Sequence, residues 1–178
     1  MFQHVRPVIG VDHHQPVVCQ DYDPRADQVA REIAALIREH LPQVVADHVG
    51  STAVPGCAGR GVVDLMIPIS DEELEVVTAL LDRLGFQSQK PREPFPDDRP
   101  LRVGAWQHEG EEFRLHVHVI PANSPEVDEM RFFRTCLRSD PELLKLYVAR
   151  KRAILAEGKT DPIEYYHAKD AFMKELFG

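Results

Sequence analysis

The amino-acid sequence predicts an α+β fold, with a small mixed sheet of about five strands flanked by helices and a helical C-terminal segment. Short runs rich in Val and Ile alternate with amphipathic helical patterns over most of the chain, whereas the last third shows three helical patterns and no strand pattern. The chain has 178 residues and no internal repeat or linker. We therefore expect one domain over residues 1–178.

Strand and helix patterns alternate in the first part of the chain. Residues 1–16 contain Pro7, Gly10 and Pro16, which favours a loose N-terminal arm or a short edge strand. Asp23-Pro24 begins an amphipathic helix that ends near Pro42. The other expected elements are strands over 17–22, 44–49, 62–69, 86–89, 102–108 and 112–120, a helix from Asp71 to a cap at Gly85, and a turn at 109–111 that makes the last two strands antiparallel.

Prolines mark the boundaries in the second half. Residues 90–100 hold four prolines, which predicts a surface loop. Ser124-Pro125, Asp140-Pro141 and Asp161-Pro162 each place a capping side chain before a proline at the first helical turn. Three helices are therefore expected, near 125–138, 141–157 and 162–177.

Charge and cysteine content exclude several classes of protein. The formal net charge of -8 argues against a general DNA, RNA or anionic-membrane partner. The three cysteines are odd in number and lack a CxxC pair, so we expect neither a disulfide framework nor a thiolate zinc site. The N-terminus lacks a signal peptide and no apolar run is long enough to span a bilayer, so a cytoplasmic protein is expected.

The stretch HVGSTAVPGCAGRGVVD, from His48 to Asp64, is the densest in functional groups. Its Gly-Ser turn follows a strand and offers backbone N–H groups and a hydroxyl that suit a phosphate. Asp64 lies in an apolar strand, where a carboxylate is costly unless it is paired or binds a cation. The alternative is that Asp64 only accepts hydrogen bonds from the preceding loop or from Arg60.

His116 and His118 alternate with apolar residues on the last expected strand, so both imidazoles project from one face. With Asp64, and with His48 as a further candidate, they form a His/carboxylate set for a divalent ion, or one His acts as a general base. The alternative is that both imidazoles hydrogen-bond across the sheet.

Basic side chains are concentrated in the C-terminal helical patterns. Arg134 and Arg138 share a helix face and suit either a phosphate or carboxylates across an interface, with a solvated face as the alternative. Tyr165 and Lys169 also share a face, and packing of the Lys stem on the ring explains them. Ser51 lies in GST and not in a GxSxG elbow, and the chain has no Walker loop.

Four motifs, in order along the chain, resemble the GrpB family (glutamate-rich protein B): HVGSTAVPGCAGRGVVDLMI, RLHVHVI, MRFFRTCLRSDPELLKLYVARKRAIL and EYYHAKDAF. The resemblance covers the chain from Tyr22 to its end. It implies a nucleotidyltransferase-like fold, in which a Gly-Ser turn follows one strand, an Asp-x-Asp pair lies on the next, and a third carboxylate completes a site for two metal ions and a nucleoside triphosphate.

Carried over residue by residue, Gly50 and Ser51 resemble the phosphate-side turn and Asp64 resembles the first carboxylate. Met66 stands where the second carboxylate is needed, so the two-metal site is incomplete. His116 and His118 fall near the third carboxylate. The chain also departs from the family pattern at Arg60-Gly61, where Lys-Pro is usual, and at Thr135-Cys136, where Asp-Tyr is usual.

The expected function is binding of a nucleotide or another phosphorylated small molecule, with metal-dependent nucleotidyl transfer left open by Met66. A non-catalytic interaction or folding-assistance module and a single-metal hydrolase are the alternatives. Asp64, His116 and His118 are the expected catalytic residues and the ligands for a divalent Mg, Mn or Zn ion. The expected ligand-binding residues are Gly50, Ser51, Thr52, Arg60, Arg134, Arg138 and Lys151.

Overall fold

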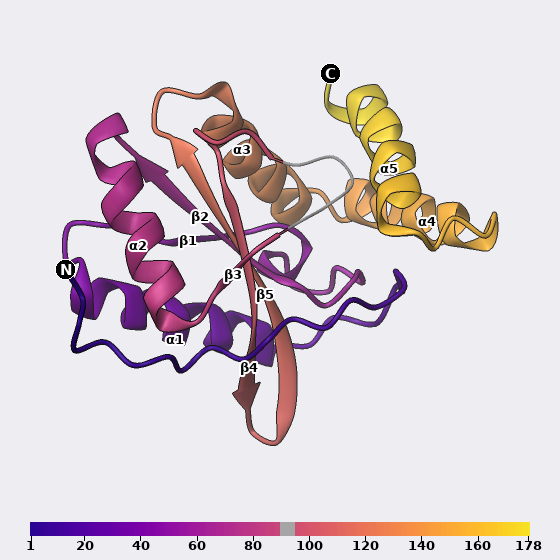
Figure 1. Ribbon diagram of the computed structural model, residues 1–178. Helices are drawn as coiled ribbons and strands as arrows, with labels where there is room; N and C mark the ends of the chain where they lie inside the picture. Colours follow the sequence, from indigo (N-terminus) through magenta and orange to yellow (C-terminus); the bar gives the residue numbers. More distant parts are fainter. Residues whose placement is uncertain (90–94) are drawn as a thin grey trace.

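The computed structural model describes residues 1–89 and 95–178, and it folds them around a five-stranded sheet (Figure 1). The strand order is β1-β2-β5-β4-β3. Strand β2 runs parallel to β5 and the other neighbours are antiparallel, which confirms the predicted mixed sheet. The strands are β1 (Asp47–Val49), β2 (Val63–Ile69), β3 (Gln87–Ser88), β4 (Leu101–His108) and β5 (Glu111–Pro121).

Strands β4 and β5 form the predicted antiparallel hairpin. Glu109 and Gly110 connect them, with φ angles of 51° and 81°. Two central residues with positive φ give a turn whose twist matches that of the flanking strands. Of the proline-rich loop expected over 90–100, residues 90–94 lie outside the described residues.

Helices α1 (Arg25–His40) and α2 (Leu74–Leu84) cover one face of the sheet. The Asp23 carboxylate accepts a hydrogen bond from the Arg25 N–H and holds the start of α1. Gly85 ends α2 with φ 105°, as expected. The two helices and the inner face of β2 and β5 bury one large apolar cluster, which includes Ile33, Ile37, Leu65, Leu80, Leu81, Leu115 and Val117.

Helices α3 (Pro125–Ser139), α4 (Pro141–Ala156) and α5 (Pro162–Phe177) confirm the three predicted C-terminal helices. Ser124, Asp140 and Asp161 each accept hydrogen bonds from the first helical N–H groups. Helix α3 contacts β1 and β5, while α4 and α5 lie apart from α1 and α2, at the right of Figure 1. A second apolar cluster joins α3, α4 and α5 to the segment after β1, with Val54, Cys57, Leu137, Tyr147, Ile154, Tyr165 and Phe172 among its members.

The N-terminal segment departs from one expectation. The predicted strand over 17–22 is wrong, because only a single bridge between Gln20 and Gly59 forms there. Within residues 1–16, Val5 and Ile9 are buried and Gly10 forms a single bridge with Ala105 of β4, while most of the other residues are exposed. Burial of apolar side chains holds this segment despite its prolines. Among the described residues, no helix combines the length and apolar character needed to cross a membrane.

Candidate functional site

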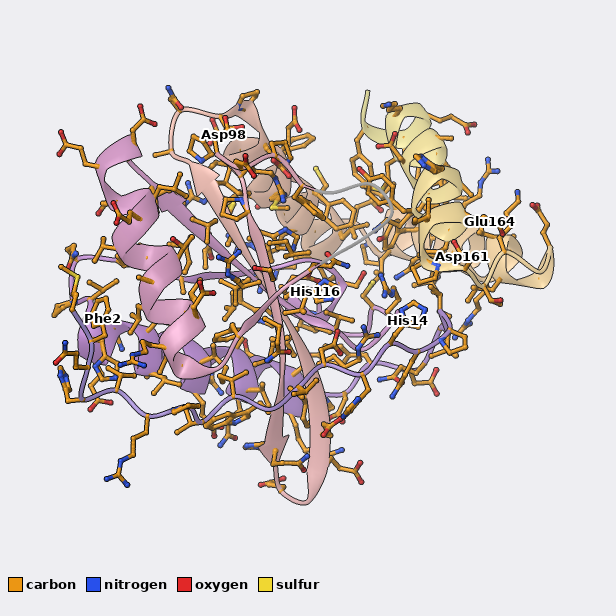
Figure 2. All side chains as sticks on the ribbon, viewed as in Figure 1. Phe2, His14, Asp98, His116, Asp161 and Glu164 are labelled. Carbon is orange, nitrogen blue, oxygen red and sulfur yellow. The ribbon has the colours of Figure 1, made fainter. Side chains whose placement is uncertain are left out.

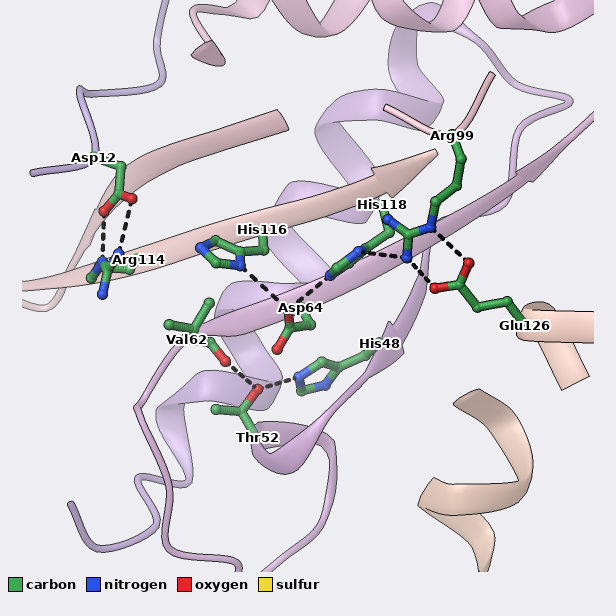
Figure 3. Close-up of polar contacts among 10 residues, drawn as sticks. All are labelled: Asp12, His48, Thr52, Val62, Asp64, Arg99, Arg114, His116, His118 and Glu126. Carbon is green, nitrogen blue, oxygen red and sulfur yellow. Dashed lines mark hydrogen bonds and ion pairs between the residues drawn. The ribbon is translucent and has the colours of Figure 1, made fainter. Parts of the chain in front are cut away.

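Strands β2 and β5 bring together the acidic and imidazole side chains expected from the sequence. Asp64 of β2 is the direct register partner of His116 of β5, and His118 lies two residues further on the same face. His118 Nε2 lies 3.0 Å and His116 Nδ1 lies 3.8 Å from Asp64 Oδ1 (Figure 3). Figure 2 places His116 near the middle of the molecule. One ligand atom from each of these three side chains lies within 4.8 Å of the others.

The protonation states of Asp64 and His116 follow from their surroundings. Burial opposes ionisation of Asp64, but the hydrogen bond from His118 and the electrostatic interactions of the carboxylate with the two imidazoles and Lys169 more than offset it, so the pKa of Asp64 lies below its ordinary value. Burial lowers the pKa of His116 to about 4. His116 is therefore neutral at pH 7, and its buried Nε2 has no hydrogen-bond partner among the described residues.

Arg99 fixes the tautomer of His118. The Arg99 Nη2 group lies 3.2 Å from His118 Nδ1, and a guanidinium has only donors, so Nδ1 is the acceptor. The ring proton is thereby assigned to Nε2, which donates to Asp64. Arg99 is in turn paired with Glu126 of α3, with Nε 2.6 Å from Oε2. The sequence patterns did not identify Arg99, because it lies in a loop without periodicity.

The Gly-Ser turn packs directly against Asp64. Gly50 has φ 75°, and a Cβ atom there would lie 2.6 Å from Asp64 Oδ2. Only glycine therefore lets the turn approach the carboxylate so closely. Residues Ser51–Ala53 continue as one 3₁₀ turn, η1.

Thr52 and His48 hold this turn in place. The Thr52 hydroxyl donates to the Val62 carbonyl oxygen at 3.1 Å and accepts from His48 Nε2 at 3.0 Å. His48 is thus engaged with the turn and is not part of the group formed by Asp64 and the two histidines of β5. Binding of a ligand by Thr52 stays a prediction.

Lys151 of α4 contacts the turn at Ser51 and is only 2% exposed. Its Nζ lies 3.2 Å from Ser51 Oγ, 3.6 Å from Cys57 Sγ and 4.3 Å from the centre of the Tyr147 ring, and it also donates to the Ala58 carbonyl. In the described part of the chain it forms no ion pair with a carboxylate. Burial accordingly lowers the pKa of Lys151.

Arg60 and Lys169 add two further cations beside Asp64. Arg60 Nε is buried and finds no hydrogen-bond partner within residues 1–89 and 95–178. Burial, together with the charges of Lys151 and Arg60, lowers the pKa of Lys169 to about 8, while Asp64 acts in the opposite direction. The sequence interpretation gave Lys169 a packing role only. Its place in the EYYHAKDAF motif is the sequence signal that could have identified it as a site residue.

Arg134 and Arg138 bind protein groups. Arg134 Nη1 donates to Asp47 Oδ1 at 2.6 Å, so it meets a carboxylate across the α3–β1 interface, one of the two roles open from the sequence. Arg138 Nε donates to the Ala53 carbonyl at 2.8 Å. Both arginines dock α3 on β1 and on the η1 turn, and a ligand role for either stays a prediction.

Met66 occupies the position at which the second carboxylate of an Asp-x-Asp pair would lie. It lies two residues after Asp64 on the same face of β2, is fully buried, and packs with Val49, Ile120 and Val127. A carboxylate at this position would be buried among apolar side chains. The position that a second carboxylate would occupy therefore belongs to the packing between the sheet and α3.

Sequence comparisons place these features in a known group of proteins. The family model described as "GrpB protein" matches residues 16–178. A UPF0157 protein of Pseudomonas aeruginosa is 32% identical over 139 residues, which cover 78% of this chain and 56% of that relative. A UPF0157 protein of Streptomyces coelicolor is 30% identical over 163 residues, covering 91% of this chain and 83% of that relative. The chain thus spans little more than half of the Pseudomonas protein.

Solved structures share the fold. The conserved protein GrpB from Enterococcus faecalis matches with a TM-score of 0.71 and 24% identity, over 89% of this chain and 94% of that one. A chain of the GLD-2/RNP-8 complex matches with a TM-score of 0.59 and 12% identity, over 84% and 51%. A poly(U) polymerase bound to Mg 3′-dATP matches with a TM-score of 0.55 and 13% identity, over 83% of this chain and 49% of that one. The fold is therefore nucleotidyltransferase-like, and the chain spans about half of each of these last two chains.

Proposed function

Since the chain belongs to the GrpB family, with its nucleotidyltransferase-like fold, we propose that it binds a nucleotide or another phosphorylated small molecule beside the Gly-Ser turn. The observation that carries the proposal is a surplus of positive charge around Ser51 and Asp64. Lys151 is buried without a carboxylate partner in the described part of the chain, and Arg60 Nε is buried without an acceptor there. Buried cations and unsatisfied donors are unfavourable unless an anion accompanies them.

The structural neighbours support a nucleotide as the ligand class. The poly(U) polymerase with the shared fold is bound to Mg 3′-dATP. In this chain the Gly50 turn packs against Asp64 at a distance that only glycine allows, which places the backbone of the turn beside the carboxylate. Binding is favoured over nucleotidyl transfer, because Met66 fills the position of the second carboxylate with an apolar side chain.

The other candidate functions account for less of the site. An interaction or folding-assistance module explains neither the buried Lys151 nor the unsatisfied Arg60 Nε. A single-metal hydrolase would use Asp64, His116 and His118, whose ligand atoms lie within 4.8 Å of one another, but it would leave the cations without a role.

Calorimetric titration tests the proposal directly. ATP, CTP, coenzyme A and inorganic phosphate are each titrated into the protein in the presence of Mg²⁺, Mn²⁺ or Zn²⁺. We expect saturable binding of at least one ligand, and weaker binding to Lys151→Met. Lys145→Met is the matched control, because Lys145 lies on the same helix and pairs with Glu142 in solvent. Absence of binding under every condition would refute the proposal.

A further inference from the structure

The basic side chains around Asp64 also indicate how the ligand is held, an inference that rests on the proposed function. We propose that Arg60, Lys151 and Lys169 bind a dianionic phosphate group directly, without a divalent cation. The ligand class is thereby narrowed to molecules with a terminal phosphate, such as phosphate monoesters and nucleotides. Three lines of evidence on the described residues support this mode of binding.

The Asp64, His116 and His118 side chains do not fit a divalent ion as they are arranged. A histidine binds a metal through a nitrogen lone pair. His118 Nε2 carries the ring proton and donates it to Asp64 at 3.0 Å, while the lone pair of Nδ1 faces the Arg99 guanidinium at 3.2 Å. Metal binding at His118 would therefore require loss of one of these hydrogen bonds.

The balance of charge around Asp64 favours an anion. Three basic side chains, Arg60, Lys151 and Lys169, accompany the carboxylate of Asp64, and none of them forms an ion pair within 4.0 Å among the described residues. The other carboxylates of this region are already paired, Asp47 with Arg134, Asp12 with Arg114, Glu126 with Arg99, and Asp170 with Lys174. A phosphate monoester carries about two negative charges at neutral pH. A divalent cation would instead add to the surplus.

One buried hydrogen-bond donor beside Asp64 lacks an acceptor among the described residues, and a second cation lies against the Ser51 hydroxyl. The buried Arg60 Nε has no acceptor among the described residues, and Lys151 Nζ lies 3.2 Å from the Ser51 hydroxyl. Gly59 allows this approach, because a Cβ atom there would lie 3.1 Å from Lys151 Nζ and 3.2 Å from Ser51 Cβ. Phosphate oxygens are the acceptors that such charged donors bind most strongly.

The test is a titration of inorganic phosphate and of ATP in EDTA and, in parallel, in Mg²⁺. We expect phosphate to bind in EDTA with an affinity within about threefold of that in Mg²⁺. Asp64→Asn should bind phosphate in EDTA at least as tightly as the unchanged protein, because the substitution removes a negative charge. Binding that requires Mg²⁺ and is lost in Asp64→Asn would overturn this inference and leave the proposed function standing. No binding in either buffer would overturn both.

Two variants on α5 test whether phosphate binds at Lys169. Lys169→Met should weaken phosphate binding by about 10- to 100-fold, the loss expected for one hydrogen bond to a charged group. Lys174→Met should change affinity by less than about twofold, because Lys174 is exposed and pairs with Asp170. Circular dichroism verifies that both variants are folded. Equal affinities of the two variants would overturn the inference.

Discussion

Gly50→Ala should lower the free energy of unfolding far more than the same substitution at Gly56, another glycine of this loop. Gly50 has φ 75° and ψ −171°, a region open almost only to glycine, and placing Ala there costs about 1–3 kcal/mol. The new Cβ would also lie 2.6 Å from Asp64 Oδ2. Moving Asp64 away weakens its 3.0 Å hydrogen bond with His118, which is worth about 1.5–3 kcal/mol.

Together these effects predict a loss of about 2.5–6 kcal/mol, reduced by up to about 1 kcal/mol because Ala also restricts the unfolded chain. For a chain of this size the melting temperature should fall by about 10 °C. Gly56→Ala is the control, since Gly56 has φ 80° but no heavy atom within 4 Å of the added Cβ, and it should lose only about 1 kcal/mol. Equal losses in urea unfolding of the two variants would refute this account of the turn.

Three further predictions concern the buried ionisable groups. Burial lowers the pKa of His116 to about 4, so only the unfolded chain binds that proton as the pH falls from about 6.5 to about 4. The free energy of unfolding should therefore drop by about 3 kcal/mol over this window, and urea titrations of His116→Gln should show a flatter profile. Arg99→Met removes the donor that keeps the proton off His118 Nδ1, so both neutral tautomers of His118 should be populated. ¹⁵N NMR should then show the proton exchanging between the two ring nitrogens, whereas an unchanged Nε2–H form would contradict the assignment. Lys151→Met removes a buried charge that has no carboxylate partner among the described residues, so the melting temperature of the ligand-free protein should rise. A lower melting temperature would show that the contacts of Lys151 with Ser51 and Ala58 outweigh the cost of burying the charge.

The local features of the fold were predictable because they depend on neighbours in the sequence. The three caps before Pro125, Pro141 and Pro162 and the turn at 109–111 need no distant contact. The predicted strand over 17–22 failed for the opposite reason. Its Val17 packs in the cluster formed with the C-terminal helices, so tertiary burial, and not strand pairing, explains the apolar residue.

The candidate site shows the same limit. Alternation in β5 placed His116 and His118 on one face, but only the parallel pairing of β2 with β5 brings Asp64 to them. Arg99 and Lys169 reach the site through tertiary packing. Neither the tautomer of His118 nor the surplus of positive charge could therefore be derived from spacing in the sequence.

The two large apolar clusters have a mechanical consequence. Asp64 lies on a strand of the sheet packed under α1 and α2, whereas Lys151 and Lys169 belong to the helices of the other cluster. The lysines and the carboxylate thus belong to elements packed in different clusters. A phosphate bound as proposed would contact elements of both clusters and so link them. Hydrogen exchange in α4 and α5 should then slow when phosphate is added, even though those helices make no new contact with the sheet.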